Sequence, residues 1–156
     1  GDIDAVAAYV KSFSPRFARE APEPIAAGEP VPRSTTSVAR GAEVYQTLQC
    51  AKCHGTNGRG RDATATTFED ENGVPVRAAD LTEPWTFRGG AEPADIFMRF
   101  RAGMAGTPMP SYKGAASDAD MWHLANYVAS LRRKPVWEMT ADEVAARRGS
   151  PSVPAT

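Results

Sequence analysis

Residues 50–54 read Cys50-Ala51-Lys52-Cys53-His54, and the rest of the chain is organised around them. On a helical turn, positions i, i+3 and i+4 lie on one face, so both thiols and the imidazole point in the same direction. The residues before Cys50 carry apolar side chains at Val38, Tyr45 and Leu48, a spacing that predicts a helix leading into the motif. Two sulfur donors and one nitrogen donor are therefore available to a single cofactor.

C-x-x-C-H is the attachment signature of c-type haem. The two thiols can add to the vinyl groups on one edge of a porphyrin, while the imidazole reaches the iron from below the ring plane. A redox-active dithiol would follow a strand, whereas a helix is predicted here. A four-ligand zinc site would need both cysteines and both histidines of the chain, at a spacing unlike zinc fingers. We therefore expect one haem c, covalently attached through Cys50 and Cys53, with His54 as an axial iron ligand.

A second motif lies further along the chain. Residues 106–110 read Gly106-Thr107-Pro108-Met109-Pro110, and a helix is predicted at each end of the span from about Ser37 to Lys134. Together with Cys50–His54, these features resemble the class I cytochromes c, and more closely their bacterial mono- and dihaem relatives. The resemblance implies an all-α fold with helices packed around one covalently bound haem, here with N-terminal and C-terminal extensions. It also implies that the first helix of the domain crosses the last.

The crossing predicted from this resemblance involves four residues. Gly41 and Tyr45 fit the small and aromatic positions of the first helix. Leu124 and Tyr127 occupy the corresponding places on the last helix, which is predicted from the 3-4 spacing of its apolar residues. Close approach of the two backbones would explain a glycine inside a helix, where it costs about 0.5–1 kcal/mol relative to alanine.

The second iron ligand must come from elsewhere in the chain. The five methionines are Met98, Met104, Met109, Met121 and Met139. Met109 lies between Pro108 and Pro110, which stiffen the loop and leave the thioether little conformational entropy to lose on binding. Met98 and Met121 lie on predicted helices, where methionine more often fills a core. We predict Met109, with Met104 as the alternative, and we expect His123 to be a solvated surface residue.

Two further residues are candidates for contact with the haem. Trp85 could donate a hydrogen bond to a propionate through its indole N–H, and Arg88 could form an ion pair with one. The alternative interpretation is a core tryptophan and a solvated arginine. No proline follows His54 before Pro75, so the sequence does not identify the carbonyl that would accept a hydrogen bond from the second imidazole nitrogen.

The sequence divides into four parts. Residues 1–20 form a helical arm, 21–36 a Pro-rich linker, 37–134 the cytochrome c domain, and 135–156 a tail with one short helix, which we expect to pack through Trp137. Aligning Tyr9 with Tyr127 matches every large apolar residue of 2–13 with one in 120–131, as in an internal repeat. The arm is therefore interpreted as the last helix of an upstream cytochrome c domain, although two amphipathic helices of similar composition could also align this well.

The predicted function is electron transfer. A haem iron with His and Met in both axial positions has no open site for substrate, and this ligand pair raises the reduction potential. The net charge of −1 indicates no nucleic-acid partner, and no apolar run is long enough to span a membrane. The absence of an initiator methionine suggests a processed or excised chain. The family resemblance implies haem attachment outside the bacterial cytoplasmic membrane, in the periplasm. We therefore expect a non-enzymatic electron carrier of a respiratory chain that exchanges electrons with redox partner proteins. The alternatives are an electron-entry module of a larger multihaem oxidoreductase and a haem-based sensor.

Overall fold

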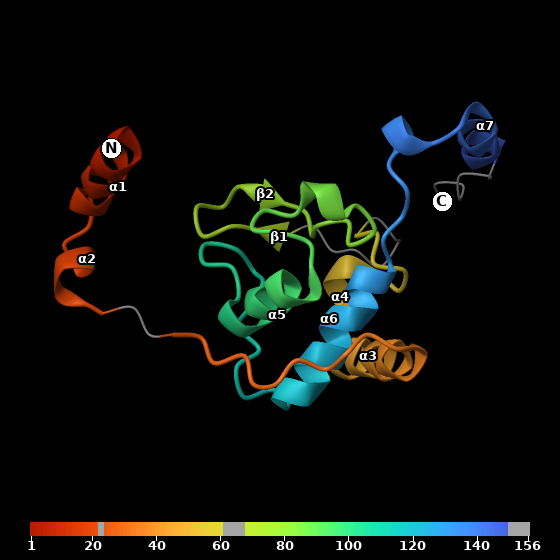
Figure 1. The fold of residues 1–156 in the computed structure, drawn as a ribbon, viewed down its shortest axis with the longest axis horizontal. Helices are drawn as coiled ribbons and strands as arrows, with labels where there is room; N and C mark the ends of the chain where they lie inside the picture. Colours follow the sequence, from red (N-terminus) through yellow and green to blue (C-terminus); the bar gives the residue numbers. More distant parts are fainter. Residues whose placement is uncertain (22–23, 61–67, 150–156) are drawn as a thin grey trace.

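The computed structural model describes residues 1–21, 24–60 and 68–149, so part of the predicted linker (22–23) and of the tail (150–156) lies outside the described residues. The elements are α1 (Asp2–Ser12), α2 (Arg16–Arg19), α3 (Thr35–Thr47), α4 (Ala51–His54), β1 (Phe68–Glu69), β2 (Pro75–Val76), η1 (Pro84–Thr86), α5 (Pro93–Ala102), α6 (Asp118–Ser130), η2 (Val136–Glu138) and α7 (Ala141–Gly149) (Figure 1). The predicted all-α fold is confirmed, with only two short strands in these ranges. None of the described helices is long and apolar enough to cross a membrane.

The core lies where α6 packs against both α3 and α5. Its buried apolar side chains are Val44, Tyr45, Ile96, Phe97, Phe100, Met121, Trp122, Leu124, Ala125 and Val128. On α6 these residues recur at three- and four-residue spacing, which places them on the faces turned to the two neighbouring helices. Phe97 of α5 and Trp122 of α6 stack with ring centroids 4.5 Å apart.

The crossing of α3 and α6 depends on Gly41. A Cβ atom added there would lie 2.0 Å from the carbonyl oxygen of His123 and 2.6 Å from the Cβ of Tyr127. One turn later, the rings of Tyr45 and Tyr127 lie 5.3 Å apart. The predicted crossing is thus confirmed at Gly41, Tyr45 and Tyr127. The two backbones approach so closely that no side chain fits between them, which explains the glycine inside the helix.

The start of α3 is capped by Ser34, whose hydroxyl accepts a hydrogen bond from the backbone N–H of Ser37 at 3.0 Å. Ser37 lies inside the helix and is buried. Its hydroxyl is engaged by α6 rather than by its own helix, because Asn126 donates to it at 2.9 Å.

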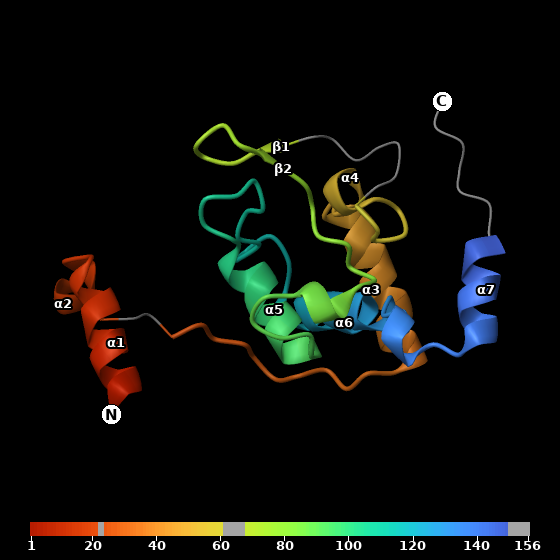
Figure 2. The same ribbon diagram turned by 90° about the horizontal axis from the view of Figure 1, so that it is seen from above.

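The Pro-rich segment before α3 lies along α6 in both ribbon views (Figures 1 and 2). The indole Nε1 of Trp122 donates to the carbonyl of Ala27 at 2.7 Å, and the Nδ2 of Asn126 donates to the carbonyl of Val31 at 2.9 Å. We call residues 27–31 the strap. These two bonds satisfy backbone carbonyls of an extended segment that has no neighbouring strand. The second half of the predicted linker is therefore attached to the domain.

A small hairpin lies within residues 68–76, after α4. Strands β1 and β2 pair antiparallel, with Phe68 opposite Val76. The turn between them contains Asn72 and Gly73 and is closed by the Asp70 carboxylate, which accepts from the backbone N–H groups of Asn72 and Val74 at 2.8 and 2.9 Å. Acidic residues therefore cluster at the tip of the hairpin.

The two ends of the chain pack less than the centre. No residue of α1 or α2 is buried, and both helices lie apart from the core in Figure 2. At the other end, the short helix predicted in the tail is α7, and reciprocal bonds between Thr140 and Glu143 cap its start. Trp137 was expected to anchor the tail, but it is 70% exposed and makes only an edge contact with Trp85, with centroids 5.2 Å apart.

Candidate functional site

The motif of residues 50–54 forms the short helix α4 directly after α3. Gln49 takes a positive φ of 59°, which turns the chain sharply between the two helices. The backbone N–H of Cys50 then donates to the carbonyl of Tyr45 at 3.0 Å, and the N–H of His54 to the carbonyl of Cys50 at 2.9 Å. Both cysteines are free thiols. The predicted helical turn, with its three side chains on one face, is confirmed.

The imidazole of His54 has a defined partner. Its Nδ1 lies 3.0 Å from the carbonyl oxygen of Ala79. Because a carbonyl can only accept, Nδ1 must carry the proton, and the lone pair is left on Nε2. Burial lowers the pKa of His54, and the Ala79 carbonyl only partly opposes that effect. The ring is therefore neutral at neutral pH and oriented as a metal-binding histidine requires.

Ala79 is the functional residue that sequence reasoning missed. Its contribution is a backbone carbonyl, which any amino acid could supply, so no side-chain signal identifies it. The structure places it through close contact of two loop segments: Leu81 N–H donates to the Gly58 carbonyl at 2.6 Å. A Cβ on Gly60 would lie 2.8 Å from the carbonyl oxygen of Ala78, so this approach requires a glycine.

The segment carrying Ala79 is also attached to the end of α6. The Asp80 carboxylate accepts from the backbone N–H and the hydroxyl of Thr82, at 2.9 and 2.6 Å. The Arg133 guanidinium forms ion pairs with Asp80 and Glu83, and its backbone N–H donates to the Thr82 carbonyl at 3.0 Å. These contacts hold the carbonyl acceptor of His54 at a fixed place relative to the core.

Tyr45 supports the motif from the other side. Its hydroxyl donates to the carbonyl of Gly55, the residue after His54, at 2.7 Å, and the side chain is fully buried. The same residue forms the helix crossing with Tyr127. Packing of α3 on α6 and the position of the motif are therefore linked through one side chain.

The surroundings of the thiols are apolar. Burial raises the pKa of Cys50 to about 11, so this thiol is protonated at neutral pH. Tyr112 lies near both cysteines: burial raises its pKa first, and the two sulfurs add to that effect. Tyr112 also packs against the hydrophobic core, and its N–H donates to the Phe100 carbonyl at 2.9 Å. It joins the site although sequence reasoning did not select it.

The loop carrying Met109 is internally bonded. The N–H of Met104 donates to the Met109 carbonyl at 3.1 Å, and the N–H of Met109 to the Thr107 hydroxyl at 3.3 Å. Met109 is half-buried and packs against the core, whereas Met104 is exposed. Of the two methionines predicted to fill a core, Met121 is fully buried and Met98 is exposed.

His123 differs from the expectation of a solvated residue. It is half-buried, and its Nδ1 lies 2.9 Å from the hydroxyl of Ser37. The same hydroxyl accepts from Asn126. His123 therefore belongs to the polar contacts between α3 and α6, a place that the polar neighbours of His123 in the sequence do not reveal.

Trp85 and Arg88 lie in the segment between Ala79 and α5. Trp85 is exposed rather than a core residue, and its ring contacts that of Trp137 in the tail. The Arg88 side chain is exposed, and its carbonyl accepts a hydrogen bond from Nη2 of Arg99. Their predicted role at a haem propionate stays a prediction.

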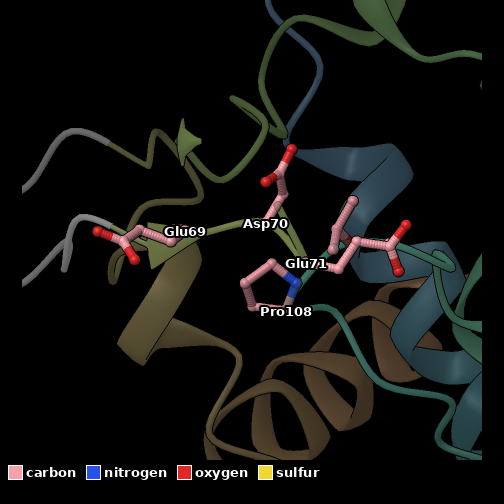
Figure 3. Close-up of a pocket in the computed structure, with 6 residues that line it drawn as sticks. Glu69, Asp70, Glu71 and Pro108 are labelled. Atoms are coloured by element: carbon pink, nitrogen blue, oxygen red, sulfur yellow. The ribbon is translucent and has the colours of Figure 1, made fainter. Parts of the chain in front are cut away.

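Acidic side chains lie next to the methionine loop. Glu71 N–H donates to the Gly106 carbonyl at 3.3 Å, which joins the β1–β2 hairpin to this loop. Figure 3 shows Glu69, Asp70 and Glu71 pointing in different directions around Pro108. The carboxylates do not converge on one point, and no cluster of three metal-ligating side chains occurs in the described ranges. The hairpin is thus an acidic surface beside the loop.

The donors of residues 50–54 fit a covalently bound haem. Two free thiols stand one helical turn apart, and the adjacent histidine has Nδ1 engaged and Nε2 left for a metal. The surrounding helices supply an apolar core, and a half-buried methionine packs against it. Fold and site together define a small all-helical protein that attaches haem through C-x-x-C-H.

Comparison with known proteins identifies the family. The chain belongs to the cytochrome c family, whose model matches residues 38–132. Cytochrome c domains carry out haem-based electron transfer with redox partners and are typically extracytoplasmic.

One solved structure is also similar. A chain of the reducing HAO-like protein complex of Kuenenia stuttgartiensis is 40% identical, with a TM-score of 0.71 over 80% of this chain and 57% of that chain. The present chain thus spans little more than half the length of that relative. None of the curated proteins matches.

Proposed function

We propose that this chain transfers single electrons through one haem c attached to Cys50 and Cys53, with His54 and Met109 as axial ligands. The observation that carries the proposal is the hydrogen bond from His54 Nδ1 to the Ala79 carbonyl at 3.0 Å. It fixes the tautomer and leaves Nε2 for iron, an arrangement typical of metal-ligating histidines.

The side chains of the site have separate roles in this proposal. The haem, when bound, supplies a one-electron iron couple whose potential depends on its axial ligands and surroundings. His54 binds through Nε2, and the Ala79 carbonyl increases the basicity of its ring. The Met109 thioether would be the second protein ligand of the iron, so that both positions open to a substrate would be filled. Trp85 and Arg88 bind the propionates, and we assign no catalysis to the chain alone.

The proposed setting is the periplasm, with redox partner proteins of a respiratory chain as donor and acceptor. The extracytoplasmic location typical of cytochrome c domains supports this placement. The acidic hairpin next to the Met109 loop would favour partners with basic surfaces, because opposite charges accelerate association.

A second candidate function is that of an electron-entry module of a larger multihaem oxidoreductase. The observation in its favour is the likeness to a chain of the reducing HAO-like protein complex at 40% identity. In this case the chain would pass electrons within a stable assembly. Size-exclusion chromatography of the native protein from cell extract distinguishes the two, because a free carrier elutes at its own mass.

The haem content is tested by intact mass and by the alkaline pyridine spectrum. We expect the mass of residues 1–156 to exceed that of the polypeptide by about one haem, and the spectrum to show two thioether links. Zinc in place of haem, or the bare polypeptide mass, would overturn the proposal. Carbon monoxide added to the reduced protein tests the sensor alternative, since a firmly ligated iron should hardly respond.

The axial ligand is tested with a matched pair of variants. Met109→Ala should remove the weak sulfur-to-iron band of the oxidised protein and lower the reduction potential, because a thioether favours ferrous iron. Met104→Ala, in the same loop, should leave both unchanged. The reverse pattern would assign the ligand to Met104.

A further inference from the structure

Helix α1 carries an apolar face that nothing in the described structure covers. Ile3, Val6 and Val10 are 85%, 62% and 51% exposed, and Tyr9 and Phe13 extend the same surface. We call these five residues the arm face. A helix of 11 residues is marginal in water without a packing partner. An apolar stripe of this kind on so short a helix indicates that it is built to be covered.

The sequence of α1 repeats that of α6. With Tyr9 aligned to Tyr127, identical residues stand at Asp2 and Asp120, Ala7 and Ala125, Val10 and Val128, and Ser12 and Ser130. Ile3, Val6 and Phe13 match Met121, Leu124 and Leu131. The alignment covers the whole of α1 without a gap.

The structure shows what these positions do in α6. Met121, Leu124 and Val128, the counterparts of Ile3, Val6 and Val10, are only 0–2% exposed because α3 and α5 cover them. Tyr127, the counterpart of Tyr9, packs on Tyr45 and borders Gly41 at the crossing. The side chain of Leu131, the counterpart of Phe13, would lie 2.7 Å from a Cβ on Gly58, in the loop after the haem motif.

The positions at which the two helices differ are also informative. Trp122 and Asn126 bind the strap, and His123 contacts Ser37. Their counterparts in α1 are Asp4, Ala8 and Ala5, which cannot make those contacts. The apolar positions through which α6 enters the core are therefore matched in α1, whereas the residues that α6 uses to bind the strap and Ser37 are not.

We propose that α1 is the closing helix of a second cytochrome c domain, carried by the same polypeptide before Gly1. The arm face is covered by that domain's own first helix, which presents a small residue opposite Tyr9 and an aromatic ring one turn later, as Gly41 and Tyr45 do for Tyr127. The segment from Ser14 to the strap then connects two haem domains. The proposal does not depend on which methionine binds the iron in residues 37–134.

The strap supports a tethered arrangement. Because Ala27 and Val31 are bonded to α6, only residues 14–26 separate α1 from the attached chain. A connection of this length can reach at most about 45 Å when fully extended. A domain held so close has a high effective concentration at its neighbour, which favours the encounters in which two haems can exchange electrons.

The first test counts haems in the polypeptide as its gene encodes it. We expect the pyridine spectrum and the intact mass to give at least two covalent haems, with a second C-x-x-C-H within about 100–150 residues upstream of Gly1, the usual size of a domain. A single haem in the complete polypeptide overturns the proposal. The count is independent of electron transfer by residues 37–134, so failure of the proposed function would be seen separately in the Met109→Ala spectrum.

The second test places a charge on the arm face of that complete polypeptide. Val6→Asp should lower the unfolding midpoint of the upstream haem domain by about 5–10 °C, as expected for a buried apolar residue in a domain of this size, and leave the downstream haem unchanged. Ala8→Asp adds the same charge on the opposite side of α1, which already carries Asp4 one turn earlier, and should shift neither. If Val6→Asp instead dissociates a dimer of a single-haem chain, a second copy covers the arm face and the proposal is wrong.

Discussion

The imidazole of His54 is held by the backbone carbonyl of Ala79, 25 residues further along the chain, at 3.0 Å. Two contacts keep that carbonyl in place: the bond from Leu81 N–H to the Gly58 carbonyl, and the turn in which Asp80 accepts from Thr82. Arg133 then joins this turn to the end of α6. The orientation of the proposed iron ligand thus depends on the last helix of the domain, although the two are far apart in sequence.

Replacing Asp80 should loosen the acceptor of His54. Asp80→Ala leaves the backbone N–H of buried Thr82 without its partner, which we expect to cost about 1–3 kcal/mol of the free energy of unfolding. The haem reduction potential should rise, because a weaker bond at Nδ1 makes the imidazole a poorer donor. Urea unfolding and redox titration measure the two effects. Asp142→Ala, an exposed change on α7, is the control, and equal results for both variants would contradict the prediction.

Adding one methyl group at Gly41 should separate α3 from α6. The new Cβ would lie 2.0 Å from the His123 carbonyl oxygen, so the helices must move, at an expected cost of about 1–3 kcal/mol. Ala39→Val adds methyl groups to an exposed position of the same helix and should cost less than that. Thermal unfolding of the two holoproteins gives the comparison, and a Gly41→Ala protein as stable as the wild type would show that the helices do not cross here.

Removal of the Tyr45 hydroxyl should destabilise the backbone next to the haem motif while leaving the packing of α3 on α6 in place. Tyr45→Phe keeps the ring packed on Tyr127 but leaves the buried Gly55 carbonyl without its 2.7 Å donor. We expect a loss of about 1–3 kcal/mol in stability, measured by urea unfolding. Tyr127→Phe is the matched control, because it keeps the same ring pair and does not touch Gly55. Similar losses in both variants would refute a specific role of the hydroxyl.

Part of the loss of folding stability at acidic pH should come from protonation of Asp120. The hydrogen bond from Arg40, at 2.9 Å, holds the pKa of Asp120 below its ordinary value. A carboxyl group with a lowered folded-state pKa stabilises the protein above the unfolded pKa of about 3.9, and this contribution is lost as the pH falls through the folded value. Arg40→Gln should therefore lower the urea midpoint slightly at pH 7 and leave it unchanged near pH 2. An equal effect at both pH values would rule out this pair as the cause.

Local sequence patterns were sufficient to predict most of the helices and the arrangement of the C-x-x-C-H motif. The spacing within residues 50–54 requires both thiols and His54 on one helical face whatever the surrounding fold, because it depends only on helix geometry. The N-terminal helix also follows from the spacing of its own apolar residues. Gly41 was placed at the crossing through a family resemblance, which carries tertiary information that composition does not.

Contacts between distant segments were decided only by the tertiary structure. The Ala79 carbonyl has no side-chain signature, so its bond to His54 appears only when residues 58–60 and 78–81 lie side by side. His123 is read as a surface residue from its neighbours, yet α3 brings Ser37 to it. The strap is a Pro-rich linker by composition, and it is attached because Trp122 and Asn126 offer donors to its carbonyls. The spacing of apolar residues indicates which face of its own helix a residue occupies. A backbone carbonyl acceptor, or a hydroxyl on another helix, becomes a partner only when the packed core brings two distant segments together.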